Sequence, residues 1–420
     1  MKRLYPVMAL GALCASGNAL AADPSLAAYN PAFALIFQGN AYYDNRNGEV
    51  PAMLDQHDNA FANMSGDSEG PQRGLNLDGT ELEVTSNIDP YFDAWLAVTF
   101  ENGKANVEEA WFRSLSLPHG LQLKAGRLLS GIGYHNEKHA HKWDFADQNL
   151  AYTALFHGEH LNGDGVQLTY LPATDNYWLI GAEVLQGSGL NGFGGELDSK
   201  ATAADLGVNE SQLGLSQKSG PNLFTGFVRF APDLGSTQAL QLGVSSAYHR
   251  QQQGLFSAQG GELVSQGDAS LYGAQAVYKR FATGEYGKGS LNLAAEYFYA
   301  SGKQQASFAT QASLADANVR QTEQAGYIQA TYGFAPRWKI GYRHAVAGIN
   351  SRLKVAGETR DLHASNQDSL ALTWQLTEFS RFRFQVSHDR LHDSSDQLQR
   401  ANQVNLQYIM VMGAHGAHTF

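Results

Sequence analysis

Apolar and polar residues alternate with a period of two along much of this chain. Leu240, Leu242 and Val244, for example, share one parity, while Gln241 and Gly243 occupy the other. Successive side chains of an extended strand point to opposite faces, so the alternation predicts strands with one apolar and one polar face. It recurs in sixteen segments, each about as long as a membrane-crossing strand of about ten residues.

The sixteen segments extend from residue 32 almost to the end of the chain. They begin near Ala32, Gly79, Phe92, Ala105, Leu121, Asp164, Tyr177, Leu223, Ala239, Ser270, Gly289, Ala325, Trp338, Asp368, Arg381 and Ala401. The fourth segment, Ala105–Leu115, alternates poorly and is the weakest of the set. Eighteen strands are the alternative, with an extra strand hidden within Gln186–Asn222.

The connections between segments are sorted by length. Short connections, such as Asp89–Tyr91 and Ala335–Arg337, are separated by longer ones. The long connections are Asp44–Asp78, Leu128–Gly163, Gln186–Asn222, Arg250–Asp268, Ser301–Gln324 and Gly348–Gln367. Outer-membrane barrels have short turns at one end and long loops at the other. We therefore predict an all-β fold, a transmembrane antiparallel up-and-down β-barrel with both termini on the side of the short turns.

The N-terminus has the features of a cleavable export signal. Met1–Arg3 is basic, Leu4–Ala15 is apolar, and Ala19–Ala21 has the small residues of a cleavage site. The apolar run is too short to cross a bilayer as a helix. We therefore expect residues 1–21 to be a signal peptide and residues 22–420 to form a single barrel domain.

Composition narrows the classes of function. Without the signal, 27 basic and 40 acidic residues remain, a net charge of −13 that argues against a nucleic-acid partner. No mature stretch approaches the roughly 18 consecutive apolar residues of a transmembrane helix. The mean hydropathy is −0.32, although the chain has 19 Tyr and 21 Phe. A polar average with many aromatic residues suits a barrel that is wet inside and apolar outside.

The C-terminus adds a second indication of a barrel. The chain ends in Phe420, after a stretch in which Val404, Leu406 and Tyr408 share one parity. A final strand that ends in an aromatic residue resembles the assembly signal of bacterial outer-membrane barrels. This resemblance implies the barrel-assembly machinery as a partner that binds through Phe420. An ordinary edge strand with a chance terminal Phe is the alternative.

Several stretches resemble known porins. Leu121–His141 is similar to porins of the phosphate-selective superfamily, in which a strand with a Gly-Arg or Gly-Lys pair, here Gly126–Arg127, runs into a glycine-containing loop. Asn30–Tyr43 and Asn87–Phe100 resemble a porin-like group often labelled zinc-regulated or TonB-dependent outer-membrane receptor. TonB-dependent receptors have a plug domain inside a barrel of about 22 strands. Strand-like alternation starts here soon after the cleavage site, so we expect no plug domain.

The resemblance to sixteen-stranded porins implies that the third outer loop, Leu128–Gly163, folds into the barrel and forms the constriction. Strand parity adds acidic residues early in the chain and basic residues later. The candidate pore-lining residues are Glu81, Glu83, Asp93, Glu137, Asp144, Arg229, Lys339, Arg343, Arg381 and Arg383. Opposite walls of different sign would order water and favour polar solutes. A lumen wall that is simply polar is the alternative.

The same loop contains candidate metal ligands. His135, His139 and His141 form a His-x-x-x-His-x-His pattern, and imidazoles near carboxylates suit zinc or copper. These three histidines are therefore the candidate metal ligands, with zinc as the one candidate cofactor. Solvated or hydrogen-bonded loop histidines are the alternative.

These observations predict a porin-like channel in the bacterial outer membrane that passes small hydrophilic solutes or ions. Its partners would be outer-membrane lipid and, by analogy with other sixteen-stranded porins, two further copies in a homotrimer. A ligand-specific or zinc-linked receptor or uptake channel is the alternative. An enzyme is more remote, because the G-x-S-x-G match at Gly66–Gly70 lies in a polar loop and lacks the strand–serine–helix context that this motif needs.

Overall fold

The computed structural model describes residues 31–45, 73–101, 104–156, 160–187, 193–195, 197–216, 220–392 and 397–413. The strands are β1 (Ala32–Asp44), β2 (Gly74–Asn87), β3 (Phe92–Glu101), β4 (Lys104–Ser114), β5 (Leu121–Leu129), β6 (Asn162–Tyr170), β7 (Tyr177–Gln186), β8 (Leu223–Ala231), β9 (Gln238–Ala258), β10 (Gly261–Arg280), β11 (Leu291–Ala309), β12 (Asn318–Ala335), β13 (Trp338–Ala347), β14 (Ser351–Val355), β15 (Glu358–Leu362), β16 (Ser365–Thr377), β17 (Ser380–His392) and β18 (Leu398–Gly413). The α-helices are α2 (Leu150–Phe156) and α3 (Ser199–Asp205), and the 3-10 turns are η2 (Pro118–Gly120), η3 (Ala140–Lys142), η4 (Glu210–Leu213), η5 (Glu285–Gly287) and η6 (Ala312–Leu314). No helix in the described ranges is long and apolar enough to cross a membrane.

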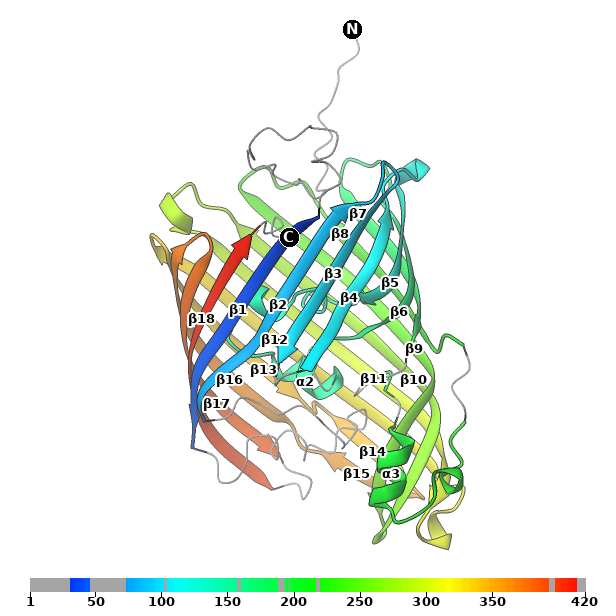
Figure 1. Cartoon of the computed structure of the whole chain (residues 1–420). Helices are drawn as coiled ribbons and strands as arrows, with labels where there is room; N and C mark the ends of the chain where they lie inside the picture. The colour runs from blue at the N-terminus through cyan, green and yellow to red at the C-terminus, as the bar shows by residue number, and fades with distance from the viewer. Residues whose placement is uncertain are drawn as a thin grey trace.

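The strands form one antiparallel sheet that closes on itself (Figure 1). β1 pairs with β18, from Ala34 opposite Gly413 to Asp44 opposite Gln403, and this pairing completes the ring. β14 and β15 form a short hairpin at the long-loop end, where β14 pairs with the first residues of β12, while β13 pairs directly with β16. The other sixteen strands make the barrel, so the predicted closed barrel of sixteen strands is confirmed.

The two ends of the described barrel lie on the same side, where the first residues of β1 pair with the last residues of β18 (Figure 1). Since β1 runs away from this side and β2 returns to it, the strands β2, β4, β6, β8, β10, β12 and β16 each end there in a short turn. The turn between β2 and β3, for example, needs only the four residues 88–91. The predicted sorting of short turns to the side of the termini is confirmed.

Three of the long connections expected from the sequence are largely strand, among them Gly348–Gln367, which contains β14 and β15. β9 and β10 extend through most of Arg250–Asp268 and meet at a two-residue turn, Gln259–Gly260. Both turn residues have positive φ angles, 49° and 76°, as a type I′ hairpin requires. β11 and β12 extend in the same way through much of Ser301–Gln324. The sequence signal fades there because a strand that projects beyond an apolar belt needs no lipid-facing parity, whereas its hydrogen bonds continue.

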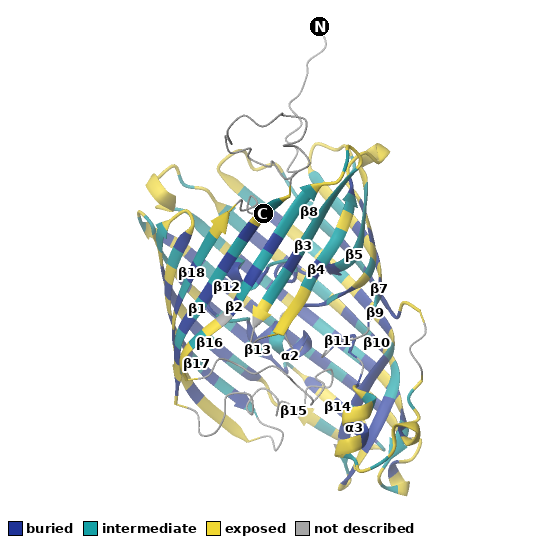
Figure 2. Ribbon diagram, viewed as in Figure 1, coloured by how far each residue is buried: buried dark blue, intermediate teal, exposed yellow. Residues whose placement is uncertain are grey.

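The inner and outer faces of the barrel differ as the alternation predicted (Figure 2). Leu372 and Phe384 lie outside with exposed fractions of 36% and 45%, while Thr373 and Arg383 lie inside at 5% and 1%. Further apolar residues on the outward parity of their strands are also exposed: Leu242, Val244, Leu293, Leu370 and Phe382. A continuous apolar outer face of this kind is what contact with lipid tails requires.

Replacing Leu372 with Arg is expected to cost about 2–4 kcal/mol of unfolding free energy, because the cation would lie on the apolar outer face. The adjacent variant Thr373→Glu should cost much less, since position 373 faces inward, opposite Lys339 and beside Arg383. Denaturant titration in lipid vesicles measures both effects. A larger cost for Thr373→Glu than for Leu372→Arg would show that the two faces of β16 are assigned the wrong way round.

The strand with the weakest alternation, β4, contains a β-bulge. Ala97 of β3 is opposite Glu109, but the next residue of β3 is opposite Val107, so Glu108 is the inserted residue. A bulge of this kind re-aims a side chain. Glu108 and Glu109 both contact groups inside the barrel, although consecutive residues of a regular strand point to opposite faces.

Candidate functional site

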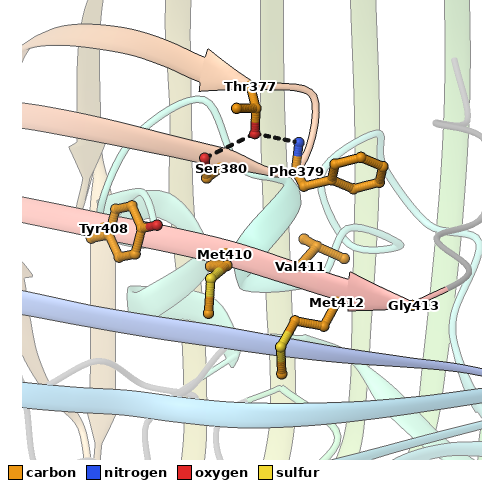
Figure 3. Close-up of a pocket in the computed structure, with 8 residues that line it drawn as sticks. All are labelled: Thr377, Phe379, Ser380, Tyr408, Met410, Val411, Met412 and Gly413. Atoms are coloured by element: carbon orange, nitrogen blue, oxygen red, sulfur yellow. Dashed lines mark hydrogen bonds between the residues drawn. The ribbon is translucent and has the colours of Figure 1, made fainter.

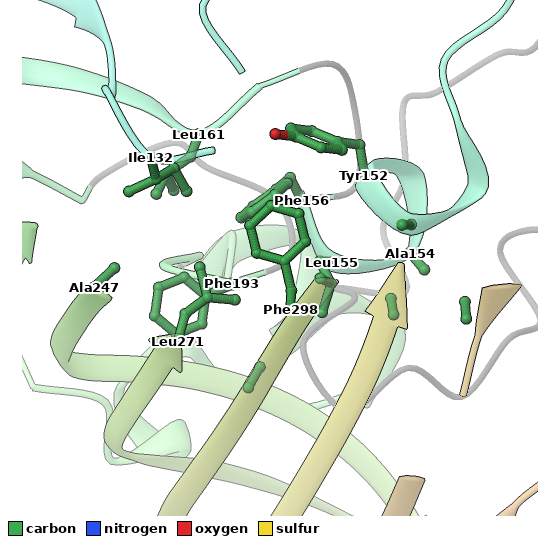
Figure 4. Packing of buried hydrophobic residues seen from close by; sticks show 14 of the residues in the cluster. Ile132, Tyr152, Ala154, Leu155, Phe156, Leu161, Phe193, Ala247, Leu271 and Phe298 are labelled. Atoms are coloured by element: carbon green, nitrogen blue, oxygen red, sulfur yellow. The ribbon is translucent and has the colours of Figure 1, made fainter. Parts of the chain in front are cut away.

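The connection between β5 and β6 lies inside the barrel (Figure 1). We call its described residues, 130–156 and 160–161, the inner loop. Helix α2 of this loop packs against β12 and β13. The rings of Tyr152 and Phe156 meet Phe298 of β11 edge-on, with centroids 5.4 and 6.0 Å apart (Figure 4). The predicted inward folding of the third outer loop is therefore confirmed.

Glu296 of β11 holds the beginning of the inner loop. Its carboxylate accepts hydrogen bonds from the backbone N–H groups of Tyr134 at 2.5 Å and His135 at 3.1 Å. The hydroxyl groups of Tyr152 and Tyr327 also donate to it, at 3.2 and 2.6 Å. A buried carboxylate is stable only when donors replace its water, and here four donors do so. The same contacts fix the loop against the wall.

Glu183 of β7 and Arg229 of β8 hold the neighbouring part of the loop. Glu183 accepts hydrogen bonds from the N–H of Gly131 at 2.8 Å and from the hydroxyl of Ser130 at 2.5 Å. Arg229 donates to the carbonyl of Gly131 at 2.7 Å and forms an ion pair with Glu137. A carboxylate and a guanidinium on adjacent strands thus bind complementary backbone groups of the same turn.

A basic wall binds the acidic residues of the loop. Lys339 and Arg343 of β13 form ion pairs with Asp144 and Asp147, at 2.7 and 2.6 Å. Arg383 of β17 donates to two backbone carbonyl groups of the inner loop, both at 2.7 Å. Since Arg343 and Arg383 are each only 1% exposed, these contacts replace the water that the two guanidinium groups lose on burial.

An acidic wall binds the histidines of the loop. Nδ1 of His139 lies 3.0 Å from Glu81 and 2.8 Å from Glu108, and its Nε2 lies 3.0 Å from Glu109. Nδ1 of His141 lies 2.8 Å from the other oxygen of Glu81. The two imidazole rings are 6.0 Å apart and nearly parallel. Carboxylates from β2 and β4 therefore surround two adjacent histidines.

The surroundings change the acidity of the loop groups. Burial opposes protonation of His139, but the three carboxylates around the ring outweigh it and raise the pKa of the imidazole well above its ordinary value. Burial, together with the nearby cation Lys279, lowers the pKa of the Lys138 ammonium group to about 7. The ammonium of Lys138 also lies 3.1 Å from the ring centroid of Tyr134. The pKa values of two neighbouring basic groups of the loop are thus shifted in opposite directions.

Most of the predicted pore-lining residues meet at the inner loop. Glu83 of β2 lies 3.5 Å from Lys142, and Arg381 of β17 donates to the carbonyl of His141. The predicted residues with side chains at the loop, or within it, are Glu81, Glu83, Glu137, Asp144, Arg229, Lys339, Arg343, Arg381 and Arg383. Acidic residues from β2 and β4 lie on one side of it, and basic residues from β8, β13 and β17 lie on another.

Two predicted residues do not have the contacts that the sequence analysis expected. Asp93 of β3 forms an ion pair with Arg113 of β4 near the short-turn end of both strands, and the expected contact with the loop is absent from its described interactions. His135 is separated from the other two candidate metal ligands. Its ring lies 5.4 Å from that of Trp143 and 5.2 Å from that of Tyr152. The three histidines are therefore not one donor set, because the loop backbone turns between His135 and His139.

Sequence reasoning missed several residues that hold the loop. Glu108 and Glu109 lie in the segment where alternation failed, and that failure was itself the signal of the bulge. Glu183 and Glu296 were not among the predicted residues of the site. Their partners are backbone N–H groups of the inner loop, which carry no signal in the sequence.

A small apolar cavity of about 360 Å³ lies near the short-turn end of β17 and β18 (Figure 3). It is lined by Thr377, Phe379, Ser380, Tyr408, Met410, Val411, Met412 and Gly413. None of these residues belongs to the inner loop or to the two charged walls. The cavity is therefore separate from the candidate site.

Comparison with known proteins places the chain in a family. No protein-family model matches it. It is 32% identical over 380 residues to an uncharacterized protein of Aquifex aeolicus (strain VF5), and the match covers 89% of this chain and 75% of that protein. The chain belongs to the family of this Aquifex protein. The relationship extends over nearly the whole barrel, and the relative's description assigns no activity to the family.

Solved structures share the fold at low sequence identity. The outer membrane channel DcaP of Acinetobacter baumannii matches with a TM-score of 0.56 and 11% identity, over 94% of this chain and all of that one. A loop-deletion mutant of Vibrio cholerae OmpT, an outer membrane protein, matches with a TM-score of 0.53 and 10% identity, over 92% of this chain and all of that one. Pseudomonas putida OprB matches with a TM-score of 0.51 and 11% identity, over 92% of this chain and 95% of that one. The chain therefore shares its barrel fold with these outer-membrane proteins.

Proposed function

We propose that this protein is an outer-membrane channel for the passive passage of small hydrophilic solutes or ions. The observation that carries the proposal is the inner loop, which narrows a closed barrel whose inner face is polar. Carboxylates of β2 and β4 and cations of β8, β13 and β17 contact the loop from different sides. Charges of opposite sign across a narrow aqueous passage orient water and favour polar solutes over apolar ones.

The structural neighbours support this function. DcaP is described as an outer membrane channel, and an anion-selective porin from Comamonas acidovorans has the same fold, with a TM-score of 0.50 and 12% identity over 91% of this chain and 99% of that one. These descriptions favour a transport role over an enzymatic one. They also support the bacterial outer membrane as the location. Export by residues 1–21 and insertion by the barrel-assembly machinery through Phe420 are parts of the proposal that rest on the sequence alone.

A trimer is the proposed assembly. One solved form of Vibrio cholerae OmpT, which shares the fold with a TM-score of 0.50 and 9% identity, is described as a trimer. Light scattering of the detergent-solubilised protein, corrected for bound detergent, tests this part of the proposal. A monomeric mass under conditions that keep the barrel folded would contradict it.

Planar-bilayer recording tests the proposed channel directly. The purified, refolded protein is expected to insert and produce stepwise, reproducible ionic currents, because a hydrated passage beside the inner loop conducts salt. Reversal potentials across a salt gradient then report the preferred sign of ion. Complete absence of current at all voltages, with folding verified by circular dichroism, would contradict the channel.

A ligand-specific or metal-linked uptake channel is the second candidate, and the imidazole–carboxylate cluster at the acidic wall favours it. The same recordings discriminate the two functions. A general channel should conduct in the presence of added solutes or zinc, whereas a specific uptake channel should close as the concentration of one ligand rises.

A further inference from the structure

The hydrogen bonds around His139 leave one carboxylate oxygen without a donor. A single ring nitrogen, Nδ1, faces both Glu108 and Glu81, at 2.8 and 3.0 Å. One nitrogen carries at most one proton, and the hydrogen bond goes to Glu108. Oε1 of Glu81 is buried and, within the described part of the chain, accepts no hydrogen bond. Two carboxylates therefore converge on a position where one proton cannot satisfy both.

The opposite edge of the same ring is held by a third carboxylate. Nε2 of His139 lies 3.0 Å from Glu109, and Glu109 also accepts hydrogen bonds from the indole N–H of Trp111 at 3.0 Å and the N–H of Leu129 at 3.3 Å. Histidines that bind a metal through one nitrogen usually donate the other N–H to a carboxylate, which orients the ring. His139 and Glu109 have this arrangement.

The β-bulge in β4 makes this geometry available. Because Glu108 is the inserted residue, it points inward together with Glu109, so one carboxylate reaches Nδ1 and the next reaches Nε2 of the same ring. Bulges that re-aim side chains are common beside functional sites. A regular strand would have put Glu108 on the outer face.

We propose that Glu81, Glu108 and Nδ1 of His139 bind one divalent transition-metal ion, with zinc as the best fit. The three ligand atoms lie within 4.8 Å of one another. A tetrahedral zinc ion with bonds of 2.0–2.1 Å separates its ligands by about 3.3 Å, so the present contacts need to open by only a few tenths of an ångström. One nitrogen and two carboxylate oxygens form a donor set that suits zinc better than magnesium or calcium, which prefer oxygen alone.

His141 is a poorer ligand for the same ion. Its Nδ1 faces Glu81 at 2.8 Å, while its other nitrogen, Nε2, faces Glu83 at 3.7 Å. Glu81, Glu83 and His141 also have one ligand atom each within 4.8 Å of one another, but the shortest contacts of the two carboxylates are with different nitrogens of the ring, and the contact with Glu83 is the longer one. The proposed ion would join the inner loop, through His139, to β2 and β4, and this cross-link does not depend on whether the barrel conducts.

Metal titration of the refolded full-length barrel tests the site. Isothermal titration with Zn²⁺ should give one strong site per chain, and Co²⁺ should give the visible absorption bands of tetrahedral coordination, while Mg²⁺ should not compete. Glu108→Gln keeps the shape of the side chain and should weaken Zn²⁺ binding by at least ten-fold. Glu109→Gln should weaken it by about 10–100-fold through the orientation of the ring.

His344→Ala is the matched control. It removes another histidine–carboxylate pair, His344 with Asp368 at 2.8 Å, on the outer face of the barrel. This variant should bind Zn²⁺ like the parent protein. Equal affinity in the parent and Glu108→Gln would overturn the proposal, as would loss of binding in His344→Ala. Loss of binding in His141→Ala together with retention in His139→Ala would also overturn it, by placing the ion at Glu83 instead.

Discussion

Replacing residues 130–161 by a short turn is expected to raise the single-channel conductance several-fold. The operation is geometrically simple, because Leu129 and Asn162 are paired at the ends of β5 and β6. A hairpin connection of about 2–5 residues can close that pair. Without the inner loop, a sixteen-stranded barrel encloses a wide aqueous channel. Planar-bilayer recording of the variant and the parent protein under the same salt measures the effect.

An equivalent deletion elsewhere provides the control. Ala347 and Ser365 are likewise paired at the ends of β13 and β16, so a short turn can replace the hairpin of β14 and β15. This variant should keep the conductance of the parent protein, because that hairpin extends the wall at the long-loop end, where β14 pairs with the first residues of β12. Equal conductance of the parent protein and the inner-loop variant would mean that the loop does not form the constriction.

Replacing Glu296 with Ala is expected to release the inner loop and to lower the free energy of unfolding by about 3–5 kcal/mol. The substitution leaves four donors without their acceptor, among them the N–H groups of Tyr134 and His135 and the hydroxyl of Tyr327. Each buried donor left unsatisfied costs about 1–3 kcal/mol, although water entering the lumen reduces the sum. Denaturant titration in lipid vesicles measures the stability.

Trypsin cleavage after Lys138 and Lys142 reports the release of the loop separately. Both lysines should be protected in the parent protein and cut in Glu296→Ala. Glu323→Ala is the matched control, since Glu323 is also a fully buried carboxylate of the barrel but accepts its hydrogen bond from Gly348, outside the inner loop. The same cleavage pattern in the parent protein and Glu296→Ala would show that Glu296 does not hold the loop.

The barrel could be predicted from the sequence because its physical cause is local. Lipid outside and water inside impose opposite polarity on neighbouring residues, and this leaves a period of two in each strand, as at Leu372 and Thr373. Sixteen segments and their order follow from that period. The extensions of β9 to β12 were mistaken for loops because the same cause does not act beyond the apolar belt.

The candidate site could be predicted only in part. Parity identified the inward charges of the walls, including Glu81, Lys339 and Arg383, and the resemblance to sixteen-stranded porins identified the segment that folds into the barrel. The partners within the site join residues far apart in the chain. Arg383 and the carbonyl of Phe145, for instance, are separated by 238 positions and meet at 2.7 Å. No local pattern records such a contact.

The sequence by itself determined the strand segments and the inward and outward parity of most of them, and its resemblance to sixteen-stranded porins indicated which loop folds inward. The tertiary structure alone decided which wall binds which part of that loop. It separated His135 from His139, and it turned Glu108 inward through a bulge. The physical reason is that periodicity depends on the two solvents at each strand, whereas a buried polar contact depends on closure of the barrel, which brings distant strands around one loop.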